Sequence, residues 1–135
     1  MSDIVVDSNV LLDVLTEDSV WFEWSSAALV QYDEENVFVI NPVIYAEISI
    51  RFATVEDLED ALSQSSLERR PIPWEAAFLA GKCFQQYRQK GGARRSPLPD
   101  FFIGAHAAVE GMALLTRDAA RYRAYFPRLR LLAPE

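Results

Sequence analysis

Short apolar runs alternate with segments of helical periodicity along this chain of 135 residues. The runs occupy 4–6, 37–40 and 113–115, and each is followed by a segment whose apolar residues recur at helical spacing. Strands that alternate with helices favour a parallel sheet with helices on both faces. We therefore predict an α/β fold, a three-layer α/β/α sandwich around a parallel sheet of four to five strands, in a single domain over residues 1–135.

Turn and capping residues give the boundaries of the expected elements. Strands are expected at 3–7, 36–40, 113–116 and 129–132. Helices are expected after Ser8 or Asn9, over 18–33, after Asn41, over 55–66, over 74–90, after Pro99 and over 119–126. Asn41 followed by Pro42 is a strong helix start, because Asn caps and Pro is tolerated at the first helical position. Thr54 followed by Asp57 resembles a capping box.

Four acidic residues occupy positions that such a fold would bring together. Asp7 ends the first apolar run, and Asp118 closely follows the third. Glu47 and Asp100 lie in the first or second turn of expected helices. Ligands of open parallel sheets bind beyond the carboxyl ends of the strands, so at least three of these carboxylates are expected at one rim. Crowded carboxylates raise one another's pKa. A divalent cation would hold them ionised, and all-oxygen ligation favours Mg²⁺ or Mn²⁺.

These residue types suit hydrolysis of a phosphodiester, which needs an activated water and neutralisation of charge on the phosphate oxygens. We predict Asp7 and Asp100 as direct metal ligands, and Asp118 as a ligand directly or through water. Glu47 would be a water-mediated ligand or the group that orients the nucleophile. Asp100 also has a plain structural alternative, as a first-turn residue favoured by the helix dipole.

Three polar residues beside the carboxylates are predicted to support them. Ser8, Asn9 and Thr116 would hold the carboxylate rotamers through hydrogen bonds. Each has a structural alternative as well: Ser8 or Asn9 as a helix cap, and Thr116 as an ordinary strand residue.

The net charge of −7 conceals a division of the chain. Residues 1–68 carry fifteen acidic residues and one Arg, whereas residues 69–135 carry twelve Lys and Arg and five acidic residues. A basic surface beside an acidic pocket suits a polyanion such as RNA. Alternatively, the basic half complements the acidic half across the fold or in a dimer. Candidate substrate contacts are Arg94 and Arg95 in the loop 91–99, and Arg117. For Arg117, an ion pair with an acidic neighbour is an equal alternative.

Four motifs, in this order, resemble those of PIN-domain ribonucleases: IVVDSN at 4–9, YAEI at 45–48, LPDFFIGAHA at 98–107 and LLTRD at 114–118. The likeness is greatest to the VapC-type toxins of bacterial and archaeal toxin–antitoxin pairs. It implies a Mg²⁺- or Mn²⁺-dependent endoribonuclease that is usually a dimer and is held inactive by a small antitoxin. Ser8 and Asn9 stand where a Thr often follows the first Asp, which keeps a hydroxyl but leaves its position open.

Proteins of other classes fit less well. A phosphoacceptor receiver domain also gathers acidic residues and Mg²⁺ at strand ends, but it needs a lysine after a late strand, and every basic residue from position 91 onward is an arginine. A non-catalytic RNA- or protein-binding module would keep the fold and lose carboxylates, and none is missing here. A serine hydrolase is excluded because the sequence has no Gly-x-Ser-x-Gly.

The remaining candidate residues are expected to be structural. His106 lies six positions after Asp100, roughly 240° around a helix, so the two should not share a face. Cys83 is expected to be a small buried hydrophobe. The sequence starts without a basic leader or cleavage site, and no apolar run approaches ~20 residues, so we expect a cytoplasmic protein with no membrane span.

Overall fold

A five-stranded parallel sheet forms the centre of the fold in the computed structural model, which describes residues 2–95 and 98–135. The strands are β1 (Ser2–Val6), β2 (Asn36–Ile40), β3 (Leu67–Arg69), β4 (Ala113–Leu115) and β5 (Leu131–Leu132). Their order in the sheet is β3-β2-β1-β4-β5, and every neighbouring pair is parallel.

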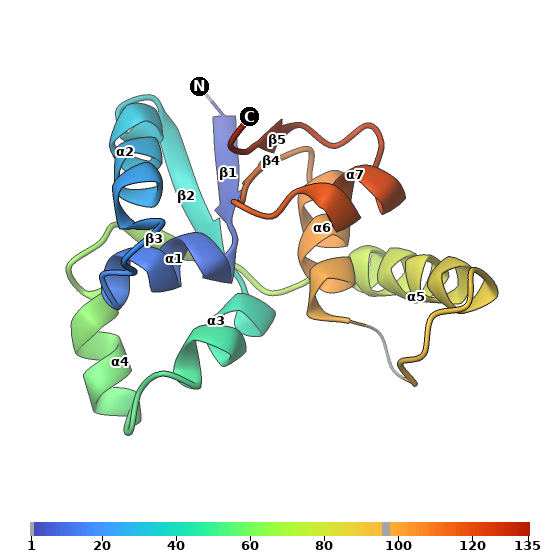
Figure 1. Ribbon diagram of the computed structural model, residues 1–135, viewed down its shortest axis with the longest axis horizontal. Coiled ribbons are helices and arrows are strands. Elements are labelled where there is room, and N and C mark those ends of the chain that lie inside the picture. Colours follow the sequence, from blue (N-terminus) through green and yellow to red (C-terminus); the bar gives the residue numbers. More distant parts are fainter. Residues whose placement is uncertain (1, 96–97) are drawn as a thin grey trace.

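Helices cover both faces of the sheet. They are α1 (Ser8–Leu15), α2 (Phe22–Asp33), α3 (Pro42–Ser49), α4 (Val55–Leu62), α5 (Trp74–Gln89), α6 (Pro99–Val109) and α7 (Ala120–Tyr125). Figure 1 shows α2 on one side of the sheet and α6 with α5 on the other. The predicted three-layer α/β/α sandwich is therefore confirmed.

The middle strand, β1, is buried along its apolar run 4–6. It pairs with β2 on one side and with β4 on the other, where Val6 lies opposite Leu115. Parallel strands covered on both faces consist of near-continuous hydrophobic runs, which is why the sequence pattern located β1, β2 and β4. The backbone N–H of Asp7 donates to the carbonyl oxygen of Leu115 at 2.9 Å, so the carboxyl ends of β1 and β4 lie side by side.

The start of α3 is as predicted. The Asn41 side chain accepts the backbone N–H of Ile44 at 3.0 Å, and Pro42 occupies the first helical position. At the start of α4, Thr54 accepts the backbone N–H of Asp57 at 3.1 Å, as the expected capping box requires. Helix α5 ends at Gln89, within one residue of the predicted end, and Gly91 follows with a φ of 92° that favours glycine.

The cap predicted for α1 was wrong. Asp7, rather than Ser8 or Asn9, caps this helix, and its carboxylate accepts the backbone N–H of Ser8 at 2.7 Å. Asp7 has the extended conformation of the strand that precedes it, and an extended Asp directly before a helix is a favoured cap. The cap and the candidate metal ligand are thus the same residue.

Two further boundaries differ from the prediction. Helix α2 begins at Phe22 rather than at 18, because the Asp18 carboxylate accepts the backbone N–H groups of Val20 and Trp21 and stabilises a turn there. Helix α4 ends at Leu62, and the short strand β3 that follows was not predicted. β3 is a three-residue edge strand without an apolar run, so its sequence carries little strand signal.

Ion pairs join the acidic half of the chain to the basic half. Part of the basic half therefore complements the acidic half across the fold, which is one of the two alternatives for the charge division. The pair of Arg117 with Asp13 is the least hydrated, because the Asp13 carboxylate is 2% exposed. The pairs are Arg69 with Glu59 (2.7 Å), Arg70 with Asp3 (2.5 Å) and Arg117 with Asp13 (2.8 Å).

Cys83 on α5 is buried in the core, as expected. Burial raises the pKa of its thiol, so this side chain acts as a small hydrophobe. Across residues 2–95 and 98–135, no helix combines the length and the apolar character that crossing a membrane requires.

Candidate active site

Asp7 is the buried centre of the rim at the carboxyl end of β1. Its side chain is 3% exposed. One carboxylate oxygen, Oδ1, accepts the backbone N–H of Ser8 at 2.7 Å. The other, Oδ2, accepts the hydroxyls of Thr116 and Tyr122, each at 2.9 Å. Hydrogen bonds to an ionised group are short and strong, so these three donors hold Asp7 in one orientation.

Ser8 links Asp7 to Glu47. The Ser8 hydroxyl donates to Glu47 Oε1 at 2.8 Å and lies 3.4 Å from Asp7 Oδ1. Glu47 is half-buried in the second turn of α3, so the cap that starts this helix also places its carboxylate. Asn9 Nδ2 donates to Thr116 Oγ1 at 3.2 Å, while its contact with Asp7 Oδ2 is weaker at 3.5 Å. The three predicted supporting residues therefore all lie at the rim.

Tyr122 on α7 joins Asp7 to Asp100. Its hydroxyl lies 2.9 Å from Asp7 Oδ2 and 3.3 Å from Asp100 Oδ1. The neighbouring Arg121 places Nη1 3.3 Å from Asp100 Oδ2. Neither residue was predicted. No sequence signal marks Tyr122, because the burial that makes its hydroxyl need a partner depends on where α7 packs.

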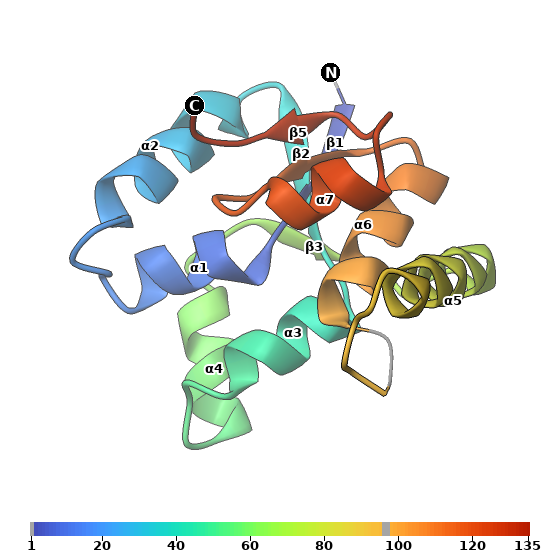
Figure 2. The same ribbon diagram turned by 45° about the vertical axis from the view of Figure 1, so that its right-hand side comes forward.

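Asp118 lies beside this network rather than within it. Its side chain is exposed, and its backbone N–H donates to Thr116 Oγ1 at 3.2 Å. Its charge acts on Asp100, whose pKa it helps to raise. The structure thus connects Asp7, Glu47 and Asp100 and leaves Asp118 at their edge. Figure 2 shows α1, α3, α6 and α7 around the carboxyl end of β1; α3 carries Glu47, and α6 carries Asp100.

Burial raises the pKa of each of the three connected carboxyl groups. For Asp7, hydrogen bonds from Thr116 and Tyr122 oppose the rise in pKa, and the charge of Asp100 adds to it. For Glu47, the charges of Asp7 and Asp100 add to the effect of burial on the pKa. For Asp100, Arg121 opposes the rise in pKa without cancelling it. Ionising these three carboxyl groups together is therefore costly, and clusters of carboxyl groups with raised pKa values mark candidate functional sites.

The predicted metal ligands at the rim fit a hydrated divalent ion. All of them are carboxylate oxygens, the ligand type that Mg²⁺ and Mn²⁺ prefer. Within residues 2–95 and 98–135, no three acidic, His or Cys side chains are close enough to enclose an ion. An open rim still suits Mg²⁺, which keeps several waters and binds through one or two carboxylates.

The three candidate RNA contacts lie in two settings. Arg94 and Arg95 are exposed in the loop between α5 and α6, of which residues 96–97 lie outside the described residues. Arg117, by contrast, donates from Nε to Asp13 Oδ2 at 2.8 Å. Arg117 therefore has the acidic pairing that was its alternative role.

His106 has a structural role, as expected. It is fully buried on α6, with Nδ1 3.0 Å from Asn41 Nδ2 and Nε2 2.8 Å from Glu110 Oε1. These contacts tie α6 to the residue that caps α3. The contact with Asn41 thus holds together the two helices that carry Asp100 and Glu47.

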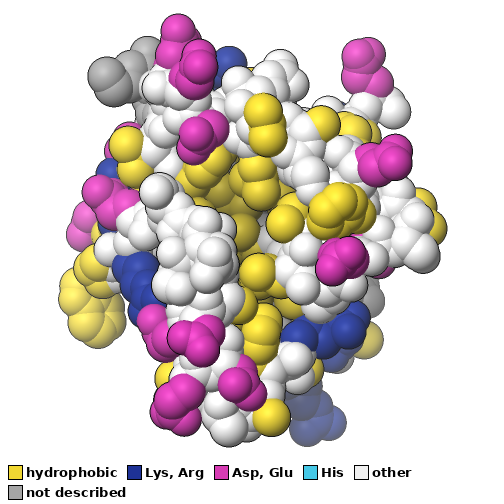
Figure 3. Space-filling view, turned by 90° about the vertical axis from the view of Figure 1, so that its left-hand side faces the viewer, with side chains coloured by type: hydrophobic (Ala, Val, Ile, Leu, Met, Phe, Trp, Pro, Cys, Tyr) yellow, Lys and Arg dark blue, Asp and Glu magenta, His cyan; other side chains and the backbone are white. Residues whose placement is uncertain are grey.

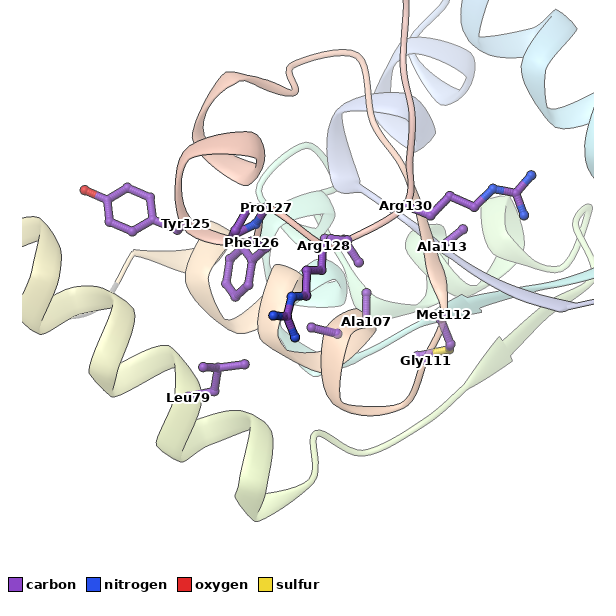
Figure 4. Close-up of a pocket in the computed structure, with 12 residues that line it drawn as sticks. Leu79, Ala107, Gly111, Met112, Ala113, Tyr125, Phe126, Pro127, Arg128 and Arg130 are labelled. Carbon is purple, nitrogen blue, oxygen red and sulfur yellow. The ribbon is translucent and has the colours of Figure 1, made fainter.

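A hollow of about 630 Å³ lies at the other end of the strands, beside the amino ends of β4 and β5 (Figure 4). It is bounded by α5, the end of α6, the start of β4 and the segment before β5. None of the four rim carboxylates lines it; Leu79, Met112, Phe126, Arg128 and Arg130 do. Because it lies at the amino end of β4, it is not where ligands of parallel sheets bind.

Comparison with known proteins gives a family and a set of structural relatives. The PIN domain model matches residues 4–127. No curated protein sequence matches the chain at a significant level. VapBC2 from Rickettsia felis, solved with a DNA fragment from its promoter, has a TM-score of 0.74 at 19% identity, covering 97% of this chain and 98% of that one.

Two other solved structures have the same fold. A toxin–antitoxin complex from Klebsiella pneumoniae has a TM-score of 0.68 at 21% identity, covering 98% of each chain. VapC20 from Mycobacterium tuberculosis, a toxin that cleaves the sarcin–ricin loop, has a TM-score of 0.64 at 13% identity, covering 94% of this chain and 98% of that one.

At such identities the solved structures establish the fold alone. The family match goes further, since it spans nearly the whole chain and includes all four rim carboxylates. The chain therefore belongs to the PIN domain family.

Proposed function

We propose that this protein is a Mg²⁺- or Mn²⁺-dependent endoribonuclease and the toxin of a toxin–antitoxin pair. One observation carries the proposal: Asp7, Glu47 and Asp100 form a connected set at the carboxyl rim of a parallel sheet. Family membership supports nuclease chemistry, and the relative from M. tuberculosis is a toxin that cleaves the sarcin–ricin loop. The basic half of the chain supports a polyanionic substrate.

Each carboxylate has a distinct role in this proposal. Asp7 and Asp100 would hold the metal, with Asp118 as a further ligand directly or through water. When bound, the ion supplies an activated water and neutralises charge on the phosphate oxygens. Glu47, which accepts a hydrogen bond from Ser8, would orient the attacking water. Because hydrogen bonds already hold Asp7 and Glu47, little reorganisation is needed when RNA binds.

The proposal is tested by incubating antitoxin-free protein with single-stranded RNA in Mg²⁺, in Mn²⁺ and in EDTA. We expect cleavage with either metal and none in EDTA. Asp7→Asn should abolish cleavage while the circular dichroism spectrum stays that of the wild type. The matched control is Asp33→Asn, which changes an exposed carboxylate on α2 and should cut normally. Cleavage in excess chelator would refute metal dependence, and failure to cut any RNA would favour a non-catalytic binding module.

An antitoxin is the second partner that we propose. Figure 3 shows hydrophobic side chains along a furrow on the face that includes α2 and α4, with acidic side chains at its borders. A hollow of about 300 Å³ between α2 and β5 is lined in part by Trp24, Tyr32 and Leu132. An apolar segment with basic residues would complement this surface. Both the antitoxin and the RNA would be met in the cytoplasm.

A homodimer completes the proposal, and the outer face of α5 is the surface that best suits it. Trp74 and Phe78, one helical turn apart, are 87% and 68% exposed. Glu75 and Lys82 are seven residues apart on this helix and so share a face. In an antiparallel pairing of two α5 helices, Glu75 of each copy faces Lys82 of the other. This self-complementarity is what a two-fold interface requires.

A further inference from the structure

Tyr122 has a hydroxyl group buried among the carboxylates of the rim. The residue is 1% exposed, and its hydroxyl lies 2.9 Å from Asp7 Oδ2 and 3.3 Å from Asp100 Oδ1. A phenol carries one proton, so it donates to only one of these two acceptors at a time. The hydroxyl therefore lies between the two carboxylates predicted to hold the metal and satisfies one of them in the metal-free protein.

The other donors to Asp7 do not share this position. An ionised carboxylate offers about four lone-pair sites. The Ser8 N–H takes one site on Oδ1, and the Thr116 hydroxyl takes one on Oδ2. Tyr122 takes another site on Oδ2, and of these three donors it alone also contacts Asp100. The Tyr122 hydroxyl thus occupies a position on Asp7 Oδ2 that also lies within reach of Asp100.

We propose that Tyr122 is a positioning residue that lowers the metal affinity of the site, because its hydroxyl competes with the ion for the oxygens of Asp7 and Asp100 that it contacts. The inference rests on the proposed function. Thr116 and Ser8 hold Asp7 from other directions and keep their bonds when an ion binds. Tyr122 has to give up at least one of its contacts. Its hydroxyl stabilises the metal-free rim at the cost of weaker metal binding.

The decisive variant is Tyr122→Phe, which removes the hydroxyl and keeps the ring. Isothermal titration with Mn²⁺ should show a Kd about tenfold lower than that of the wild type, a factor that lies within reach of one hydrogen bond to a charged group. In EDTA the melting temperature of the variant should fall, because the carboxylates lose their shared donor. The rise in melting temperature on adding Mn²⁺ should be larger than in the wild type.

Thr116→Val is the matched control. It removes a hydroxyl that bonds the same oxygen of Asp7, yet the hydrogen bonds of this hydroxyl go to Asp7, Asn9 and Asp118 and not to Asp100. We expect this variant to bind Mn²⁺ as tightly as the wild type or less tightly, because a ligand loses an orienting bond. A similar gain in affinity in both variants would overturn the inference. If Tyr122→Phe does not fold, Tyr122→Met removes the same hydroxyl with a flexible apolar chain.

The outcomes separate the inference from the function on which it rests. If the wild type binds Mn²⁺ and cuts RNA, but Tyr122→Phe binds Mn²⁺ equally or more weakly, the inference fails and the nuclease proposal stands. If neither protein binds Mn²⁺ in calorimetry, the nuclease proposal fails, and the inference fails with it.

Discussion

A substitution of Asp100 can show whether a rim carboxylate destabilises the metal-free protein by charge repulsion or stabilises it by accepting hydrogen bonds. Its neighbours are the Tyr122 hydroxyl and the Arg121 guanidinium, each at 3.3 Å. An asparagine at this position still accepts from Tyr122 through its amide oxygen. Its NH₂ would face the Arg121 guanidinium, whose contact with Asp100 is exposed and can give way to water. Asp7 is less suitable for the purpose, because the donors to both of its oxygens are buried and one of them is a backbone N–H.

We predict that Asp100→Asn raises the melting temperature of the metal-free protein by roughly 2–4 °C, the shift expected for about 1 kcal/mol in a domain of this size. The reason is that the substitution removes one of the crowded charges. Cleavage should be lost in the same variant. Melting curves in EDTA and with Mg²⁺ measure the effect, and Mg²⁺ should stabilise the wild type more than the variant. A lower melting temperature in EDTA would make Asp100 a structural acceptor instead.

The gain from Asp100→Asn should depend on pH. The folded-state pKa of Asp100 is raised, so its protonated form favours the folded protein. Stability from this group is fully present below the unfolded pKa and is lost as pH rises through the raised folded pKa. The difference in melting temperature between variant and wild type should therefore be small at low pH and grow as pH increases. A constant difference across the titration would contradict the buried charge of Asp100 as the cause.

At the level of elements, prediction succeeded where one local signal decided the structure. Helix α3 begins where Asn41 and Pro42 act together, and their effect is local. Asp18 could not be interpreted in this way, because an Asp followed by apolar residues is equally compatible with a helical first turn and a side-chain-stabilised turn. Strand β3 owes its existence to pairing with β2, a tertiary effect that three mostly polar residues do not reveal.

In the candidate site too, some residues could be predicted from the sequence, and others depend on tertiary contacts. The carboxylates that follow strands or begin helices could be predicted from topology, since parallel strands bring their carboxyl ends together. The Tyr122 hydroxyl could not, because its position depends on how α7 turns back over the rim after β4. Asp13 is a similar case: it is buried on α1 and is satisfied by Ser25 and Arg117, both distant in sequence.

The loop between α5 and α6 is predicted to contact RNA. Arg88 steadies this loop by donating to the carbonyl oxygens of Gly92 and Arg94, while the Arg94 and Arg95 side chains are exposed. Each phosphate contact on a single strand contributes about −0.7 to the slope of log affinity against log salt. We predict that Arg94→Glu with Arg95→Glu weakens RNA binding and flattens this slope by about 1.4.

Binding is measured in the Asp7→Asn background so that the RNA stays intact. The control pair is Arg128→Glu with Arg130→Glu, which reverses two exposed charges by the hollow beside the amino ends of β4 and β5. This pair should leave the slope of log affinity against log salt close to that of the protein with both arginine pairs intact. Equal slopes for the two double variants would remove the loop from the RNA-binding surface.

At the scale of the whole molecule, the outer face of α5 predicts the oligomeric state. Phe78→Glu places a charge at the centre of the proposed two-fold contact and should convert a dimer into a monomer, as measured by light scattering after gel filtration. Val30→Glu is a control of similar exposure on α2 and should leave the mass unchanged. A wild-type monomer at high micromolar concentration would refute the proposed interface.

The distance in sequence between the parts of the rim has a consequence for the protein during its synthesis. Thr116 and Tyr122 follow Asp7 by 109 and 115 residues. A ribosome that adds about 5–20 residues per second needs roughly ten seconds to cover that length. Until then the nascent chain lacks the hydroxyls that orient Asp7, and β1 lacks its partner β4. Helices α1 and α2 emerge much earlier, so a protein that recognises their surface can meet the growing chain before the rim has assembled.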